Sequence, residues 1–181
     1  MTNGFDNSRH FIGVISDTHG LLRPEAIAAL RGVELILHAG DVHNPFVLSE
    51  LEQIAPVIAV RGNHDKGNWA RDLHEIETIK IGAISICMIH DLKALEQCRT
   101  ISKFHVIISG HSHKPVSETR DGVLYLNPGS AGPRRFKLPV TLALMRIAGE
   151  DVNVEIVELL NEEVQPNETQ SSANLTTRRE K

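Results

Sequence analysis

Three short apolar segments near the start of the chain each end in a loop that carries Asp, Asn or His side chains. They cover 11–15, 33–39 and 57–60, and the loops after them read SDTHG, GDVHN and RGNHDKGN. Segments with helical features follow the first two loops, at 24–30 and 45–54, and each begins with a proline. Strands that alternate with helices favour an α/β fold.

The rest of the chain adds further strands. The pattern predicts two strands within 77–89 that turn near Gly82, a buried strand at 106–109, and a hairpin over 115–127 that turns at Asp121-Gly122. A helix is predicted at 92–99, and closing strands at 140–146 and 152–159. Only 4% of residues are aromatic, so Ile, Val, Leu and Ala must fill the core. That mix suits strands covered on both faces by helices.

A length of 181 residues favours one folded domain. We expect it to span 10–160, after a flexible N-terminus at 1–9. Residues 161–181 are polar and nearly free of large apolar side chains. They cannot offset their ordering entropy by burial, so we predict a disordered C-terminal tail.

Charge and hydropathy exclude several classes of protein. A net charge of -4 argues against stable binding to nucleic acid. No stretch approaches the roughly 20 apolar residues that cross a bilayer, and the polar start lacks a signal peptide, so we expect a cytoplasmic protein without membrane contact. Cys87 and Cys98 have neither the number nor the spacing of a disulfide framework or a zinc site, and we expect reduced thiols.

Potential metal ligands follow five of the predicted strands. Ligands gather outside the carboxyl ends of strands in such sheets, so these side chains can converge. Carboxylate, amide and imidazole donors without thiolate suit Mn, Fe, Zn or Ni. In Asp17-Thr18-His19 and in His111-Ser112-His113, the spacing lets an extended chain direct both outer side chains the same way. The candidate ligands are Asp17, His19, Asp41, Asn63, His90, His111 and His113.

These residues resemble the motifs of the calcineurin-like metallophosphoesterase superfamily, in its small single-domain phosphodiesterase branch. The resemblance covers about residues 10 to 160 and rests on five blocks in the family's order. It implies a four-layer αββα sandwich, in which two mixed β-sheets are flanked by helices. The blocks are Asp17-Thr18-His19, Gly40-Asp41, Gly62-Asn63-His64-Asp65, His90 and Gly110-His111-Ser112-His113, and the loop Asn127-Pro128-Gly129-Ser130 is also similar.

The resemblance further implies two divalent cations that share Asp41. One would be held by Asp17, His19, Asp41 and His113, and the other by Asp41, Asn63, His90 and His111. A metal-bridging hydroxide would then attack the phosphorus of a small phosphate ester. Mn is the first choice of ion, with Ni, Fe, Zn or Mg as alternatives.

Other residues receive predictions for substrate and proton handling. His64 is expected to contact the substrate and either to protonate the leaving oxygen or to stabilise its charge, with Asp65 orienting it. Asn63 and Arg134 are further candidates for substrate contact. Gly129-Ser130 is either an anion nest or a plain turn. Asp91, where this branch usually has Gly, either bonds a ligand's second nitrogen or caps the next helix.

The remaining histidines are not predicted to be metal ligands. We expect His38 to be a buried group behind the ligands. Surface or loop positions are expected for His10, His43, His74 and His105.

The sequence predicts a phosphoesterase, with a phosphodiester preferred because of the resemblance. The alternative is a catalytically silent scaffold of the same fold that acts in protein assembly. A third hypothesis is a nucleotide-binding regulator that binds without turnover. An exposed apolar strand face would favour a homo-oligomer.

Overall fold

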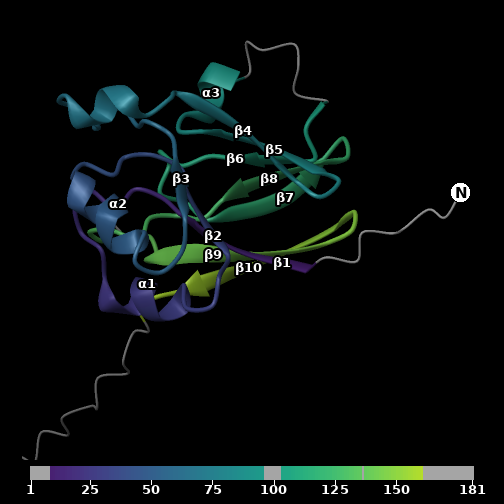
Figure 1. Cartoon of the computed structure of the whole chain (residues 1–181), viewed down its shortest axis with the longest axis horizontal. Coiled ribbons are helices and arrows are strands. Elements are labelled where there is room, and N and C mark those ends of the chain that lie inside the picture. The colour runs from purple at the N-terminus through teal and green to yellow at the C-terminus, as the bar shows by residue number, and fades with distance from the viewer. Residues whose placement is uncertain (1–8, 96–102, 136, 161–181) are drawn as a thin grey trace, which may run out of the picture.

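The computed structural model describes residues 9–95, 103–135 and 137–160. Two five-stranded sheets stack face to face (Figure 1). The first sheet has the order β10-β9-β1-β2-β3 and the second the order β4-β5-β6-β8-β7. The strands are β1 (Arg9–Ile15), β2 (Leu35–His38), β3 (Val57–Ala59), β4 (Ile76–Ile81), β5 (Ile84–Ile89), β6 (Val106–Ile108), β7 (Val116–Arg120), β8 (Val123–Asn127), β9 (Thr141–Ala148) and β10 (Asp151–Glu158).

Parallel strands form the part of each sheet that carries the polar loops. In the first sheet, β1, β2 and β3 are parallel, with Ile15 beside His38 and His38 beside Ala59. In the second sheet, β5, β6 and β8 are parallel, with Met88 beside Ile108. The remaining strands pair antiparallel, so both sheets are mixed. The carboxyl ends of each parallel set therefore lie at one edge of their sheet.

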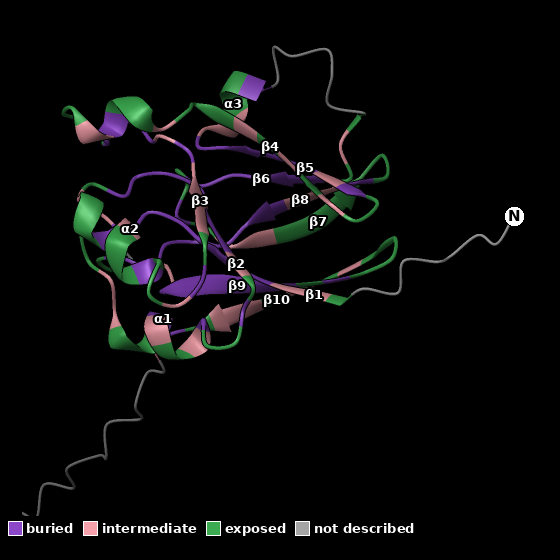
Figure 2. Ribbon diagram, viewed as in Figure 1, coloured by how far each residue is buried: buried purple, intermediate pink, exposed green. Residues whose placement is uncertain are grey.

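Three apolar clusters lie between the helices and sheets, and the strands that face these clusters contain many of the buried residues (Figure 2). Ile12, Val14, Ile86, Met88 and Ile108 are among the buried side chains between the two sheets. A second cluster packs α1 (Pro24–Ala29) and α2 (Pro45–Leu51) on the first sheet, and a third joins α3 (Leu92–Leu95) to the second. A fully buried aliphatic side chain of this size stabilises a fold by about 1.5–3 kcal/mol. The predicted αββα sandwich is confirmed.

Helices α1 and α2 are shorter than the sequence predicts. After α2, the N–H groups of Gln53 and Ile54 donate to carbonyl oxygens three residues back, so the chain tightens into a 3₁₀-like turn before Ile54. A 3₁₀ helix, η1 (Trp69–Asp72), was not predicted. Helix α3 ends at Leu95, and the predicted 96–99 portion, with Cys98, lies outside the described residues.

The predicted turns agree with the backbone. Asp121 and Gly122 have φ of 49° and 78°, which the two-residue hairpin turn between β7 and β8 requires. Arg9 already belongs to β1, whereas the predicted flexible and disordered residues 1–8 and 161–181 lie outside the described part. Within that part, no helix combines the length and apolar character needed to cross a membrane.

Candidate metal centre

The loops after β1 and β2 stay paired beyond the ends of their strands. The N–H of Asp17 donates to the Gly40 carbonyl oxygen at 3.0 Å, and the N–H of His19 donates to that of Asp41 at 2.9 Å. In the second sheet, the N–H of Gly110 donates to the His90 carbonyl oxygen at 3.0 Å. These bonds hold the predicted ligands on short, ordered connections.

Left-handed backbone recurs in three of these loops. Each loop has two such residues separated by one other, and a non-glycine residue in this conformation costs about 1–2 kcal/mol. Strain of this kind concentrates at functional sites. The six residues and their φ values are Asp17 (53°), His19 (47°), Asp41 (56°), His43 (69°), His111 (67°) and His113 (58°).

One group of donors combines Asp17, His19 and His113. The Nε2 atom of His113 lies 3.3 Å from Asp17 Oδ1 and 3.4 Å from His19 Nε2, and His19 Nε2 lies 3.9 Å from Asp17 Oδ1. Metal–ligand bonds of about 2.0–2.2 Å place neighbouring ligand atoms about 3–4 Å apart. The spacing of these three atoms therefore suits one ion.

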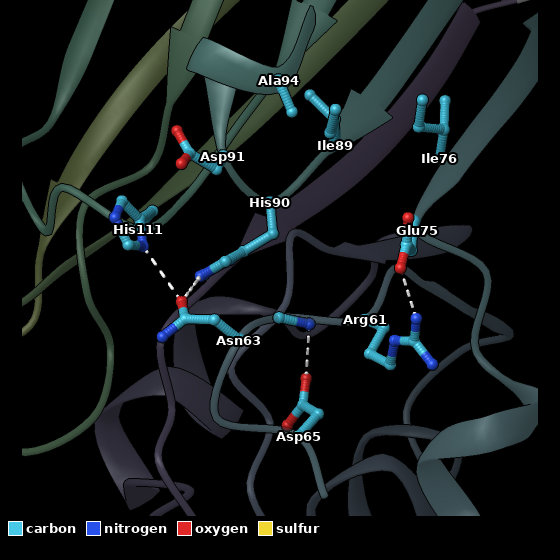
Figure 3. Close-up of a pocket in the computed structure, with 11 residues that line it drawn as sticks. Arg61, Asn63, Asp65, Glu75, Ile76, Ile89, His90, Asp91, Ala94 and His111 are labelled. Atoms are coloured by element: carbon cyan, nitrogen blue, oxygen red, sulfur yellow. Dashed lines mark hydrogen bonds and ion pairs between the residues drawn. The ribbon is translucent and has the colours of Figure 1, made fainter.

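A second group combines Asn63, His90 and His111 (Figure 3). The Oδ1 atom of Asn63 lies 3.1 Å from His90 Nε2 and 3.1 Å from His111 Nδ1. The Oδ2 atom of Asp41 lies 3.4 Å from His90 Nε2. An amide oxygen, two imidazole nitrogens and a carboxylate oxygen thus face one another.

Asp41 lies between the two groups. The same Oδ2 atom that approaches His90 is 3.8 Å from His19 Nε2. Its Oδ1 atom accepts the backbone N–H of His64 at 2.8 Å, which fixes the carboxylate. The structure therefore brings all seven predicted ligands together, and Asp41 is placed where the resemblance expects a shared ligand.

Burial favours the neutral form of two of the imidazoles. The Nδ1 atom of His90 lies 2.8 Å from the Ala39 carbonyl oxygen, which only accepts, so Nδ1 carries a proton and Nε2 is the atom that faces Asn63 and Asp41. Burial lowers the pKa of His19 and, to about 4, the pKa of His113. Burial opposes charge on His90 too, but hydrogen bonds with Asp41 and Ala39 raise its pKa on balance.

The two carboxylates of the centre have pKa values shifted in opposite directions. Burial raises the pKa of Asp17 to about 6, although Ser16 donates a hydrogen bond that lowers it. The Oδ1 atom of Asp17 is buried and has no hydrogen-bond partner among the residues that the structure describes. Burial also acts on Asp41, but hydrogen bonds from His90 and His64 hold its pKa well below the usual value. An unpartnered buried carboxylate oxygen beside two imidazole lone pairs fits a divalent cation.

Two glycines allow the loops to approach the centre closely. A Cβ on Gly62 would lie 2.2 Å from both the N and Oδ1 atoms of Asp41. A Cβ on Gly110 would lie 2.1 Å from Ser16 Oγ and 2.9 Å from Asp17 Oδ2. Any side chain at either position would displace a predicted ligand.

The rings of His43 and His64 lie near His19 of the first donor group, and these three rings form a rim at the centre. The rings of His19 and His64 have centroids 5.4 Å apart, and the exposed His43 ring lies 6.2 Å from His19 and 6.5 Å from His64. The sequence analysis missed His43. Asp41-Val42-His43 nevertheless has the same spacing as Asp17-Thr18-His19, a signal that identifies His43.

Asp65 contacts backbone atoms rather than the His64 ring that it was expected to orient. Its Oδ1 accepts the N–H of His43 at 2.6 Å, and its Oδ2 accepts the N–H of Gly62 at 2.7 Å. Both oxygens of this buried carboxylate therefore join the loops after β2 and β3.

The two consecutive arginines point to different groups. Arg134 Nε donates to the Leu138 carbonyl oxygen at 3.3 Å. The next residue, Arg135, places Nη2 at 3.3 Å from His19 Nε2. Arg135 is the second site residue that the sequence analysis did not select, although it adjoins the predicted Arg134.

The Gly129-Ser130 loop supports the centre from behind. The N–H of Gly129 donates to Asn127 Oδ1 at 2.9 Å, and Ser130 Oγ donates to the Asp17 carbonyl oxygen at 2.9 Å. These groups are engaged within the protein, which favours the turn over the anion nest.

The structure shows the contacts of His38, expected to be buried behind the ligands, and of Asp91, for which two roles were predicted. His38 is fully buried; its Nδ1 accepts the N–H of Gly40 at 3.2 Å, and its Nε2 lies 3.0 Å from Thr18 Oγ1. It therefore supports both Asp-containing loops from behind, as predicted. Asp91 Oδ1 accepts the N–H of Lys93 at 3.0 Å, which makes it the cap of α3.

The fold and its centre define an α/β sandwich protein with a candidate metal site. Residues 11–150 match the calcineurin-like phosphoesterase superfamily domain. A curated relative, "Probable metallophosphoesterase" from Methanothermobacter thermautotrophicus, is 41% identical over 157 residues, which cover 81% of this chain and 91% of that protein. The chain belongs to the calcineurin-like phosphoesterase superfamily, and the resemblance seen in its motifs is confirmed.

Solved structures have the same architecture. An archaeal phosphodiesterase matches with a TM-score of 0.68 at 27% identity, covering 81% of this chain and 99% of that one. Vacuolar Protein Sorting 29 from Cryptosporidium parvum matches with a TM-score of 0.69 at 22% identity, covering 83% and 97% of the two chains. The second likeness shows the fold alone.

Proposed function

We propose that the chain is a metal-dependent phosphodiesterase that holds two divalent cations, with Mn as the first choice and Ni, Fe, Zn or Mg as alternatives. One observation carries the proposal: Asp41 Oδ2 lies 3.4 Å from His90 and 3.8 Å from His19, each in a different donor group. The diester preference is supported by the similar archaeal phosphodiesterase. When bound, divalent cations supply an activated water molecule and neutralise charge on phosphate oxygens.

The protein's own residues hold the reacting groups and move the leaving-group proton. Asp41 stays ionised at neutral pH, because its pKa is well below the usual value. The His64 ring lies at the rim, and its backbone is fixed by the bond from its N–H to Asp41, so it is placed to donate a proton to the leaving oxygen. Arg135, beside His19, is placed to bind a phosphate oxygen.

Arg134 and Asn63 remain candidates for substrate contact. Asn63 lines the pocket next to His90 and His111, so a bound ester would lie against it. Asp65 acts here as a positioning residue, because both its oxygens accept backbone N–H groups.

The experiment begins with protein freed of metal by a chelator and then loaded with Mn, Ni, Zn or Mg. We expect hydrolysis of bis-p-nitrophenyl phosphate to return with metal and to exceed that of p-nitrophenyl phosphate. Elemental analysis should give two ions per chain. Bound metal without turnover of either ester would contradict the proposal.

The alternative of a silent scaffold draws on the fold likeness to Vacuolar Protein Sorting 29. The complete donor set at the strand ends argues for the enzyme, because a scaffold has no need of closely spaced buried carboxylate and imidazole groups. Metal-dependent turnover separates the two functions.

A further inference from the structure

A pocket of about 580 Å³ opens beside the second donor group (Figure 3). Asn63, His90 and His111 form the part of its wall that belongs to the candidate centre. Ligand pockets in proteins typically measure about 300–1,000 Å³. The pocket therefore has room for an organic group attached to a phosphate at the centre.

The wall opposite Asn63 is apolar. It consists of Ile76, Ile89 and Ala94; Figure 3 shows Ile89 and Ala94 above His90, and Ile76 above Glu75. Ile76 is 44% exposed, so part of this wall is in contact with water. An apolar or aromatic group of an ester that binds against this wall would bury its surface.

The charged groups of the pocket leave one carboxylate uncompensated. Arg61 and Glu75 form an ion pair with each other. Asp65 is buried, and its oxygens accept backbone N–H groups. Asp91 is half-buried and bonds only the neutral N–H of Lys93 among the described contacts, so its negative charge acts on the pocket.

Asp91 also lies where two hollows meet. A second hollow of about 370 Å³ shares Asp91 and His111 with the first and continues past Leu92, Val116 and Tyr125, and the cationic residues Lys93 and Arg120 also line it. A diester carries two organic groups, and an ester bound at the centre could direct one into each hollow. Both groups would then pass the Asp91 carboxylate.

We propose that these hollows bind the organic groups of a phosphodiester, and that in the first pocket Asp91 selects a group that is uncharged or cationic over one that carries a further negative charge. This inference rests on the proposed phosphodiesterase function. Asp91 acts as a specificity residue, because like charges repel at this range and opposite charges attract.

The test uses three p-nitrophenyl aryl phosphates that differ only at the para position of the second ring: carboxylate, carboxamide or trimethylammonio. We expect kcat/KM of the wild type to rise in that order. Asp91→Asn removes the charge and keeps a good helix cap, because Asn caps as well as Asp. In this variant, the ratio of kcat/KM between successive esters of the series should be smaller than in the wild type by about two- to fivefold, as expected for partly exposed charges.

The matched control is Asp151→Asn, which removes an exposed carboxylate at the start of β10 in the other sheet. It should leave all three ratios at the wild-type values. Unchanged ratios in Asp91→Asn, with turnover intact, would overturn the specificity proposal alone, whereas absence of turnover of every ester by the metal-loaded wild type would overturn the proposed function. Calorimetric binding of the three matching aryl methylphosphonates reads the same charge order without turnover, and equal affinities would also overturn the assignment of Asp91.

Discussion

The carboxylate of Asp65 accepts the backbone N–H of His43, with 2.6 Å between Oδ1 and the nitrogen. Its other oxygen accepts the N–H of Gly62 at 2.7 Å, so one buried side chain joins the loops after β2 and β3. Those loops carry the predicted ligands Asp41 and Asn63, which both approach His90 Nε2. The position of both ligands thus depends on a residue that bonds neither of them.

Replacing Asp65 by Asn should destabilise the protein. The amide keeps one oxygen, but its NH₂ group would face a backbone N–H, and a buried donor without a partner costs about 1–3 kcal/mol. Urea unfolding should show a loss of this size and an m-value near that of the wild type. Asp72→Asn, at an exposed position at the end of η1, is the control and should change stability by less than about 0.5 kcal/mol. Equal midpoints for both variants would contradict the role of Asp65.

Replacing Asp41 by Asn should abolish stabilisation by metal. In the wild type, an ion at a thousand times its Kd adds about 4 kcal/mol to the free energy of unfolding. The variant loses the negative charge that approaches both donor groups, so thermal unfolding should respond little to added Mn. Asp121→Asn, at the turn between β7 and β8, should keep the full shift. A wild-type shift in Asp41→Asn would show that this carboxylate is not a shared ligand.

His64→Ala should slow the hydrolysis of esters with poor leaving groups most. A general acid contributes about 10²–10⁴-fold when the leaving oxygen needs a proton, and little when it is already stable as an anion. The kcat for diphenyl phosphate should therefore fall at least about tenfold more than that for bis-p-nitrophenyl phosphate. His43→Ala removes the neighbouring parallel ring and should affect both esters alike. Equal losses for His64→Ala would exclude proton donation by this ring.

The two adjacent arginines provide a matched pair. Arg135→Ala should raise KM for bis-p-nitrophenyl phosphate by about fivefold, the effect of losing one exposed charge contact. Arg134→Ala should raise KM less than Arg135→Ala does, because Arg134 Nε already donates to the Leu138 carbonyl oxygen. The opposite ranking of KM values would assign the phosphate contact to Arg134.

His38 makes the stability of the metal-free protein depend on pH. Burial lowers its pKa from 6.5 to about 3 in the folded state. Between these values the unfolded chain binds a proton that the folded chain does not, so this contribution to stability is present above pH 6.5 and is lost as the pH falls toward 3. The slope from one such group is about 1.4 kcal/mol per pH unit.

His38→Gln tests this dependence by comparison with the wild type in the same buffers. The variant should lose stability at pH 8, where the difference reports packing and hydrogen bonds alone. Between pH 6 and pH 4 its stability should fall less steeply than that of the wild type. Parallel curves for the two proteins would show that His38 does not titrate on unfolding.

The sequence is sufficient for the strands and the seven donors, because apolar runs that end in Asp, Asn or His mark strand ends directly. It is insufficient where a role depends on how loops approach each other in space. The partners of Asp65 are backbone groups, which no residue pattern encodes. Arg134 and Arg135 cannot be ranked from sequence, since neighbouring residues in a loop point in unrelated directions. His43 had a readable signal in its spacing from Asp41.

Six non-glycine residues around the centre have a left-handed backbone conformation, and this conformation affects the thermodynamics of metal binding. Folding of the chain positions the donor side chains, so the cation does not have to order the loops that carry them. Loading should therefore release coordinated water with only a small change in heat capacity. The metal-free and metal-loaded forms should then differ little in amide exchange away from the rim.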